Sequence, residues 1–167
     1  MPIVQHLASQ LPGISQLSSA LILSEIGADM SVFESSKHLV SWTGLSPANN
    51  ESTDKKKSVR ISKAGQFLKP FLFQCALAAV KDKKETYFAV KYHNIKKRRG
   101  HKKAFIADTR MMLTCIYHMI LTGEAFNPSD YKELKNPVPR RVVLSDENVI
   151  AHLAAQGYDV SSLKKAV

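Results

Sequence analysis

The sequence is poor in the residue types that define several protein classes. Among its 167 residues are only two cysteines, Cys75 and Cys115, and both sit in apolar patterns of helical type. We therefore interpret them as buried thiols of a reducing compartment rather than as a disulfide or a metal pair. No apolar run approaches the roughly 20 residues that span a bilayer. The first ten residues also lack the basic start and long apolar centre of a secretory signal. These absences predict a cytoplasmic protein without a membrane segment.

Sustained alternation of apolar and polar residues, the pattern of half-buried strands, is missing too, and so are internal repeats. Apolar residues instead recur at helical spacing, and hydrophobic residues make up 44% of the chain, enough for one core. The pattern predicts a mainly α, multi-helix domain with a basic loop between helices and a short C-terminal helical appendage. Helices are expected near residues 2–10, 16–26, 35–44, 63–80, 85–99, 102–122 and 145–157.

Acidic residues are scarce in one part of the chain, and this segregates the charge. The formal net charge is +10. Between Lys55 and Lys103 there are 16 Lys or Arg and two acids, whereas the other 118 residues carry 8 Lys or Arg and 12 acids. Segregated positive charge is expected of a protein that contacts phosphates, because bound cations release condensed counterions. Nucleic acid is the predicted partner, ahead of an anionic membrane, since no strongly amphipathic surface helix stands out.

The turn between the first two expected helices has the form of a helix–hairpin–helix. In "LPGISQLSSALILSEIG", Gly13 stands between apolar residues and precedes a helix of small and aliphatic residues. Glycine allows a positive φ at the turn, and the N–H groups that begin the next helix favour a backbone phosphate. Gly13 and Ser15 are therefore candidate DNA contacts. Ser15 stands where the motif usually has a second glycine. A plain turn with a C-cap glycine is the alternative interpretation.

Residues 44–65 are polar, basic and rich in hydroxyl groups, although apolar helices flank them. Prolines and asparagines at 47, 49 and 50 favour turn backbone. A serine can attack a phosphodiester when cations or metals neutralise the developing charge, and a solvated connecting loop is the alternative. Spacing alone leaves the choice among the serines open, although Ser62 has the position of a helix N-cap. The segment contains Ser46, Ser52, Ser58 and Ser62 and the cations Lys55, Lys56, Lys57, Arg60 and Lys63.

A second basic segment, "NIKKRRGHKKAF" (residues 94–105), joins two expected helices. It is either a solvated charged turn or a surface that contacts the backbone of DNA or RNA. The aromatic residues before it, Tyr87, Phe88 and Tyr92, have the spacing of core or partner-facing residues rather than of a base-stacking platform. The candidate phosphate contacts here are Lys96, Lys97, Arg98, Arg99, Lys102 and Lys103.

Several motifs occur in a fixed order along the chain: "LPGIS" (11–15), "ALILSEIG" (20–27), "FESSKHLVSWTGLSP" (33–47), "ES" (51–52) and "RISKAGQFL" (60–68). Together they resemble the C-terminal domain of the DEDD-type insertion-sequence transposases of the 110/1111 family, over about residues 9–128. In that family an N-terminal RNase-H-like domain holds four acids that bind Mg²⁺. The C-terminal domain supplies a serine that becomes covalently linked to DNA, and a structured RNA guides the choice of sites.

The resemblance implies that Ser52 is the nucleophile and that Ser62 is structural. It also implies DNA, a structured guide RNA and the acidic N-terminal domain as partners, in a homo-oligomer on DNA in a bacterial-type, nucleoid-associated setting. Thr53 and Asp54 follow Ser52 where the family often has glycine, and Lys69 stands where the family has arginine. No acids with metal-ligand spacing appear, so the chain is expected to bind no cofactor alone, to receive Mg²⁺ through the acidic domain and not to cut DNA efficiently by itself.

The predicted function is therefore that of the DNA-binding, serine-supplying C-terminal domain of a transposase or serine recombinase, at residues 1–128. Residues 129–167 are predicted to be an extension of unknown role. One alternative is a non-catalytic nucleic-acid-binding fragment of such a transposase. Another is a protein-interaction domain in which the Met-rich helix near 102–122 dimerises and the basic loops only solubilise the chain. Salt separates the two, because phosphate binding weakens steeply as salt rises.

Overall fold

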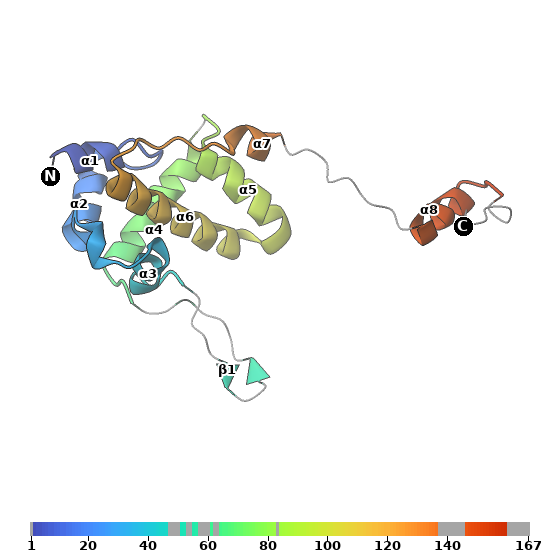
Figure 1. The fold of residues 1–167 in the computed structure, drawn as a ribbon, viewed down its shortest axis with the longest axis horizontal. Helices are drawn as coiled ribbons and strands as arrows, with labels where there is room; N and C mark the ends of the chain where they lie inside the picture. Colours follow the sequence, from blue (N-terminus) through green and yellow to red (C-terminus); the bar gives the residue numbers. More distant parts are fainter. Residues whose placement is uncertain are drawn as a thin grey trace. The chain divides into compact units, whose positions relative to one another are not determined.

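The computed structural model of the chain describes residues 2–46, 51–52, 55–56, 61, 64–82, 84–136 and 146–159. The chain divides into two compact units, Met1–Lys135 and Asn136–Val167. In the described residues the structure is mainly helical, as predicted, with one pair of two-residue antiparallel strands (Figure 1).

Most helices lie close to the positions that the sequence predicts, but α4 (Leu68–Lys81) begins at Leu68 rather than near residue 63, so the prediction of Ser62 as its N-cap is wrong. Four elements had no prediction: the strands β1 (Glu51–Ser52) and β2 (Lys55–Lys56), the 3₁₀ helix η1 (Met30–Val32) and α7 (Tyr131–Lys135). The second unit contains α8 (Asp146–Ala155). The remaining elements of the first unit are α1 (Pro2–Ala8), α2 (Gln16–Ile26), α3 (Ser36–Trp42), α5 (Tyr87–Arg99) and α6 (His101–Thr122).

Local chemistry explains where these helices begin and end. The hydroxyls of Ser15, Ser35 and Thr86 accept N–H bonds at the starts of α2, α3 and α5, which satisfies donors that a helix leaves unpaired. Gly123 ends α6 in the left-handed conformation. Pro70 lies in the first turn of α4, where its missing N–H breaks no helical bond.

Helix α6 is the centre of the first unit and contacts α1, α3, α4, α5 and η1. Met112, Leu113 and Ile116 are fully buried on it, so this part of its methionine-rich stretch belongs to the core. By length and composition alone α6 could cross a membrane, but 44% of its apolar window is buried inside the unit. One such helix is weak evidence for a membrane span, because the core helix of a soluble protein meets the same criteria of length and composition.

The chain after α6 folds back over the start of α5. The ring of Phe126 stacks on Phe88 with 5.6 Å between centroids, and the Tyr131 hydroxyl donates to the Glu85 carbonyl at 2.6 Å. Lys135 forms an ion pair with Glu85 at 2.7 Å. We call residues 124–135 the strap. The aromatic residues Tyr87, Phe88 and Tyr92 are buried, which confirms that they belong to the core.

One apolar side chain beside α4 is not part of the core. The spacing of apolar residues in 63–80 would place Phe67 on one helical face with Leu72, Cys75 and Ala79, but its side chain is 76% exposed. The reason is that α4 begins at Leu68, so Phe67 lies outside the helix and does not share its apolar face. Leu68, Leu72 and Ala79 of α4 are buried instead.

Candidate nucleic-acid interface

The two ends of the serine-bearing loop meet at one place in the fold. Gly44, just after α3, has φ +69°, and Gly65, just before α4, has φ +68°. A Cβ on Gly65 would overlap the Thr43 carbonyl oxygen, and a Cβ on Gly44 would lie 2.6 Å from the Ala64 carbonyl oxygen. Only glycine gives both the positive φ and this close approach of two backbones. We call the junction of residues 43–45 with 64–65 the neck; the segment between them leaves and re-enters the fold here.

Ser52 lies in the pair of short strands between the two ends of the neck. Glu51 pairs with Lys56 and Ser52 with Lys55, in antiparallel register. The backbones of the predicted nucleophile and of two predicted phosphate-contacting lysines are therefore neighbours. The other predicted cations of this segment, Lys57, Arg60 and Lys63, lie outside the described residues, and so do Ser58 and Ser62.

Lys69 is the charged side chain at the neck. It lies in the first turn of α4 and is 9% exposed. Its backbone N–H donates to the Gly65 carbonyl at 3.0 Å. Its Nζ atom lies 2.9 Å from the point where a Cβ of Gly44 would stand. Burial lowers the pKa of this lysine below its ordinary value. Sequence reasoning noted Lys69 only as a departure from an arginine and did not place it at the loop.

The turn before α2 has the backbone that the sequence predicts. Gly13 has φ +85°, and a Cβ there would overlap the Cys75 carbonyl oxygen and lie 2.7 Å from the Ala79 nitrogen. Its lack of a side chain therefore lets α4 pack closely against the turn. Ser15 caps α2 by accepting the Ser18 N–H at 3.1 Å. Both observations give these residues structural roles, and their contact with DNA stays a prediction.

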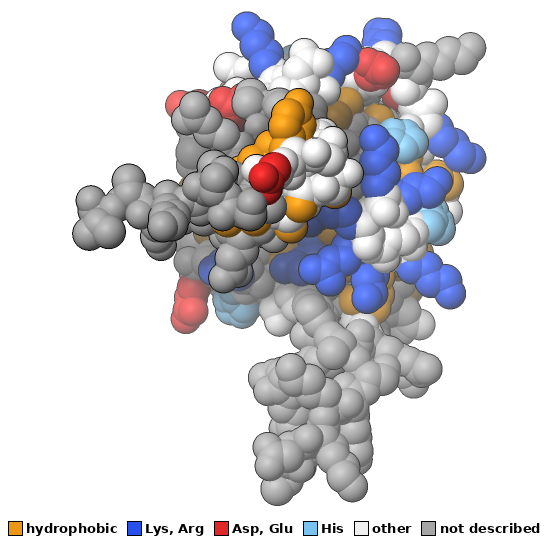
Figure 2. All heavy atoms as spheres, turned by 90° about the vertical axis from the view of Figure 1, so that its right-hand side faces the viewer, with side chains coloured by type: hydrophobic (Ala, Val, Ile, Leu, Met, Phe, Trp, Pro, Cys, Tyr) orange, Lys and Arg blue, Asp and Glu red, His pale blue; other side chains and the backbone are white. Residues whose placement is uncertain are grey.

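The second basic segment lies where α5 ends and α6 begins. We call Lys96, Lys97, Arg98, Arg99, Lys102 and Lys103 the α5–α6 corner; all six side chains are exposed. Within the described part of the chain the ion pair found is Lys135–Glu85, so no acid pairs with the corner. Figure 2 shows Lys and Arg side chains gathered with histidines on one face.

The start of α6 strengthens the positive potential of the corner. Gly100 precedes the helix and supplies no side-chain cap, and the first turn contains no acid. Backbone N–H groups at a helix start carry partial positive charge, so the cations at Lys102 and Lys103 add to it rather than compensate it. The arrangement favours an anion.

The described residues do not fit a resident metal. No group of three His, Cys, Asp or Glu side chains that could hold an ion occurs among them. Burial raises the pKa of Cys75, and burial raises that of Cys115 to about 11, so both thiols stay protonated near neutral pH. A pocket of about 300 Å³ is lined by residues of α5, α6 and the strap, Cys115 and Asp130 among them, and by none of the predicted site residues.

Comparison with known protein families decides the identity of the domain. Residues 5–93, more than half of the chain, match the family described as Transposase IS116/IS110/IS902 family. The chain belongs to this family. The matched range contains the Gly13 turn, the neck, Ser52 and most of α5. No curated protein matches the sequence.

Membership of this transposase family confirms the resemblance on which the sequence interpretation rested. A transposase family suggests DNA as a partner. The match ends at residue 93, within α5, so the α5–α6 corner lies beyond the matched residues.

Proposed function

We propose that this chain is the DNA-binding, serine-supplying C-terminal domain of an insertion-sequence transposase. The neck carries the proposal: two glycine-dependent contacts bring both ends of the Ser52 segment to one point of a rigid helical unit. A nucleophile is effective only when its position is fixed, and anchoring both ends of the Ser52 segment on packed helices supports such a role.

In the proposed reaction, Ser52 Oγ attacks the phosphorus of a scissile phosphodiester. The bond from Oγ to phosphorus forms as the bond from phosphorus to the leaving sugar oxygen breaks. The serine proton passes to water, and the leaving oxygen takes up a proton. Lys55 and Lys56, which neighbour Ser52 through the strand pair, stabilise the charge that develops on the phosphate oxygens.

The α5–α6 corner has a different role in the proposal. Its six exposed cations and the uncapped start of α6 bind the nucleic-acid backbone without reading its sequence. We propose that Lys57, Arg60 and Lys63, together with Gly13 and Ser15 at the hairpin, add further backbone contacts. The acidic N-terminal domain, a structured guide RNA and a homo-oligomer on nucleoid-associated DNA complete the proposed assembly. Mg²⁺ is proposed to be bound through the acidic domain.

A covalent-trapping assay tests the nucleophile. The full chain is mixed with element-end DNA, guide RNA, Mg²⁺ and a separately supplied acidic domain, and the products are separated on a denaturing gel. We expect a DNA-linked band that Ser52→Ala abolishes. The matched control is Ser46→Ala, a neighbouring serine of the same segment, which should retain the band. A band that persists in Ser52→Ala shows that another group is the nucleophile.

The second candidate function is a non-catalytic nucleic-acid-binding module. The lack of a metal-binding group among the described residues favours it. This function predicts salt-sensitive binding to DNA or RNA with no covalent band from the wild-type chain, even when the acidic domain is present.

A further inference from the structure

Lys69 is unusual for its position. Lysine is almost never buried unless its surroundings provide it with partners, and Lys69 is only 9% exposed. It also lies in the first turn of α4, where the helix macrodipole disfavours a cation. Burial lowers its pKa, which means that the surroundings disfavour the charged form. A side chain kept in place against these effects calls for a role beyond packing.

The contacts of Lys69 reach both ends of the serine loop. Through its backbone N–H it contacts the returning end, at the Gly65 carbonyl, 3.0 Å away. Its side chain lies beside the outgoing end, because its Nζ is 2.9 Å from the point where a Cβ of Gly44 would stand.

The outgoing end supplies a favourable place for a cation. Gly44 comes two residues after the end of α3, and helix C-termini carry partial negative charge. The carbonyl oxygens of Thr43 and Ala64 both lie at the neck. The Nζ of Lys69 lies beside Gly44, at the same junction where these two carbonyl oxygens approach the opposite end of the loop.

We propose that Lys69 is the positioning residue of the Ser52 loop, holding its outgoing and returning ends together through the ammonium at Gly44 and the amide at Gly65. The proposal rests on the function proposed above. Because Ser52 lies between the two ends, a displacement at the neck displaces the nucleophile. A misplacement of about 1 Å is enough to slow a positioned reaction by roughly 100-fold.

The test compares Lys69→Met with the wild-type full chain. Methionine keeps most of the side-chain length and removes the charge. Lys81→Met, an exposed lysine in the last turn of the same helix, is the control. We expect the covalent band to form roughly tenfold to 100-fold more slowly in Lys69→Met and at the wild-type rate in Lys81→Met. The thermal midpoint should stay within about 3 °C of wild type, because methionine fills the site without the cost of burying a charge.

A second measurement is independent of DNA chemistry. The amides of Gly44 and Leu45 donate to the Ser41 and Val40 carbonyls at 2.9 and 3.0 Å, so their hydrogen exchange reports on the neck. We expect exchange about tenfold faster in Lys69→Met, with the amides of α6 unchanged. Lys69→Arg, which retains a cation, should restore both the exchange and the covalent band; a residue that only fills space would not show this dependence on charge.

The outcomes separate the two proposals. If the Gly44 and Leu45 amides of Lys69→Met exchange hydrogen at the wild-type rate, the positioning role is overturned, whatever the DNA assay shows. Faster exchange together with a covalent band formed at the wild-type rate also overturns it, because the neck would then not control the nucleophile. If the wild-type chain forms no covalent band, the proposed function fails, and exchange alone decides whether Lys69 holds the loop ends.

Discussion

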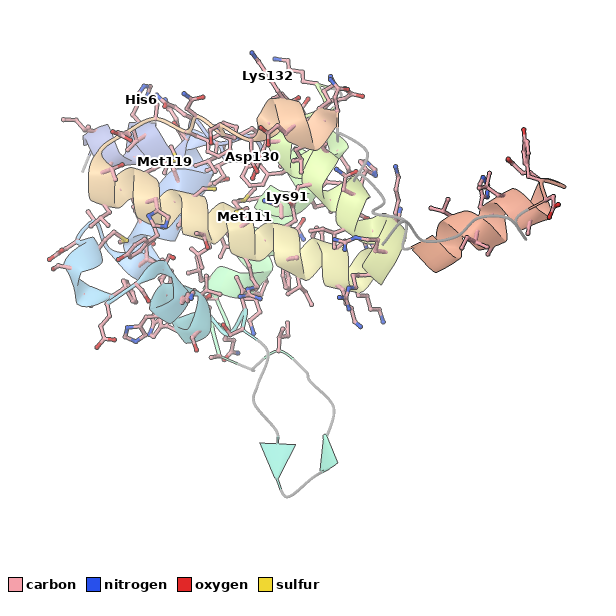
Figure 3. All side chains as sticks on the ribbon, turned by 45° about the vertical axis from the view of Figure 1, so that its right-hand side comes forward. His6, Lys91, Met111, Met119, Asp130 and Lys132 are labelled. Atoms are coloured by element: carbon pink, nitrogen blue, oxygen red, sulfur yellow. The ribbon has the colours of Figure 1, made fainter. Side chains whose placement is uncertain are left out.

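At the scale of single residues, Asp108 is the least expected side chain in the molecule. It lies on α6, is fully buried, and both of its carboxylate oxygens lack a hydrogen-bond partner among the described residues. Lys91 of α5 acts on it electrostatically, but the Lys91 ammonium donates to the Tyr87 hydroxyl at 2.8 Å. Figure 3 shows Lys91 and Asp130 near α6, and the Tyr87 hydroxyl also donates to Asp130 at 3.4 Å.

This environment makes stability depend on pH. Burial raises the pKa of Asp108 from 3.8 to about 7, against the opposing influence of Lys91. Between these values the folded state binds the proton more tightly than the unfolded state, so unfolding becomes easier as pH rises from about 4 to 7. The loss is on the order of 4 kcal/mol at most.

Asp108→Asn should therefore remove most of the decrease in unfolding free energy that rising pH causes. We expect a higher thermal midpoint than wild type at pH 8, a smaller difference at pH 5 and little difference near pH 3.5, measured by calorimetry across this range. Asp130→Asn is the control, because Asp130 is an exposed carboxylate on the same side of α5. A wild-type pH profile in Asp108→Asn would show that this carboxyl does not ionise within the window.

Residue roles were predictable from the sequence where they are local. Ser35 as a cap and Gly13 with positive φ follow from patterns of a few residues. Asp108 and Lys69 were not predictable, because a charged residue in a helical pattern indicates the solvent face unless tertiary packing covers it. Their burial depends on α5 and on the neck, which no short window contains.

At the scale of elements, the α5–α6 corner yields a quantitative prediction. If its side chains contact phosphates, each lost contact lowers the slope of log K against log salt by about 0.9 for duplex DNA. The double variant Lys97→Gln with Arg98→Gln should lower the magnitude of this slope by about 1.8, because two contacts are lost. The control pair is Lys37→Gln with Lys132→Gln, which removes the same charge from α3 and α7. Equal slopes for both pairs would indicate a general effect of net charge and no defined surface at the corner.

Long helices were predictable, and short elements were not. Helix α6 has 22 residues and a sustained apolar period, so its existence follows from the pattern. Helix α7 has five residues, and contacts far away in sequence stabilise it, such as Asn94 Nδ2 donating to the Leu134 carbonyl at 3.2 Å. The strands β1 and β2 have two residues each, too few to show alternation. The neck depends on two glycines 21 positions apart, and sequence alone gave no reason to pair them.

At the scale of the whole molecule, two different boundaries can be drawn in the chain. The family resemblance, which extends to about residue 128, predicts a domain that ends there, whereas the chain divides into compact units after Lys135. The difference is the second half of the strap, residues 129–135. The buried core cluster and the residues packed against it extend to Leu134.

Two truncations decide where the stable domain ends. A chain that ends at Lys135 retains the Tyr131–Glu85 hydrogen bond, the Asn94–Leu134 hydrogen bond and the Lys135–Glu85 ion pair. We expect its thermal midpoint to match that of the full chain within about 2 °C. A chain that ends at Pro128 loses all three contacts and the packing of Tyr131 and Leu134 against the core. Its unfolding free energy should fall by roughly 2–4 kcal/mol, mostly from the hydrogen bonds and apolar burial, because an exposed ion pair contributes less than about 1 kcal/mol. Equal midpoints for the two truncations would place the boundary at 128, and an equal loss in both would show that residues 136–167 stabilise the first unit.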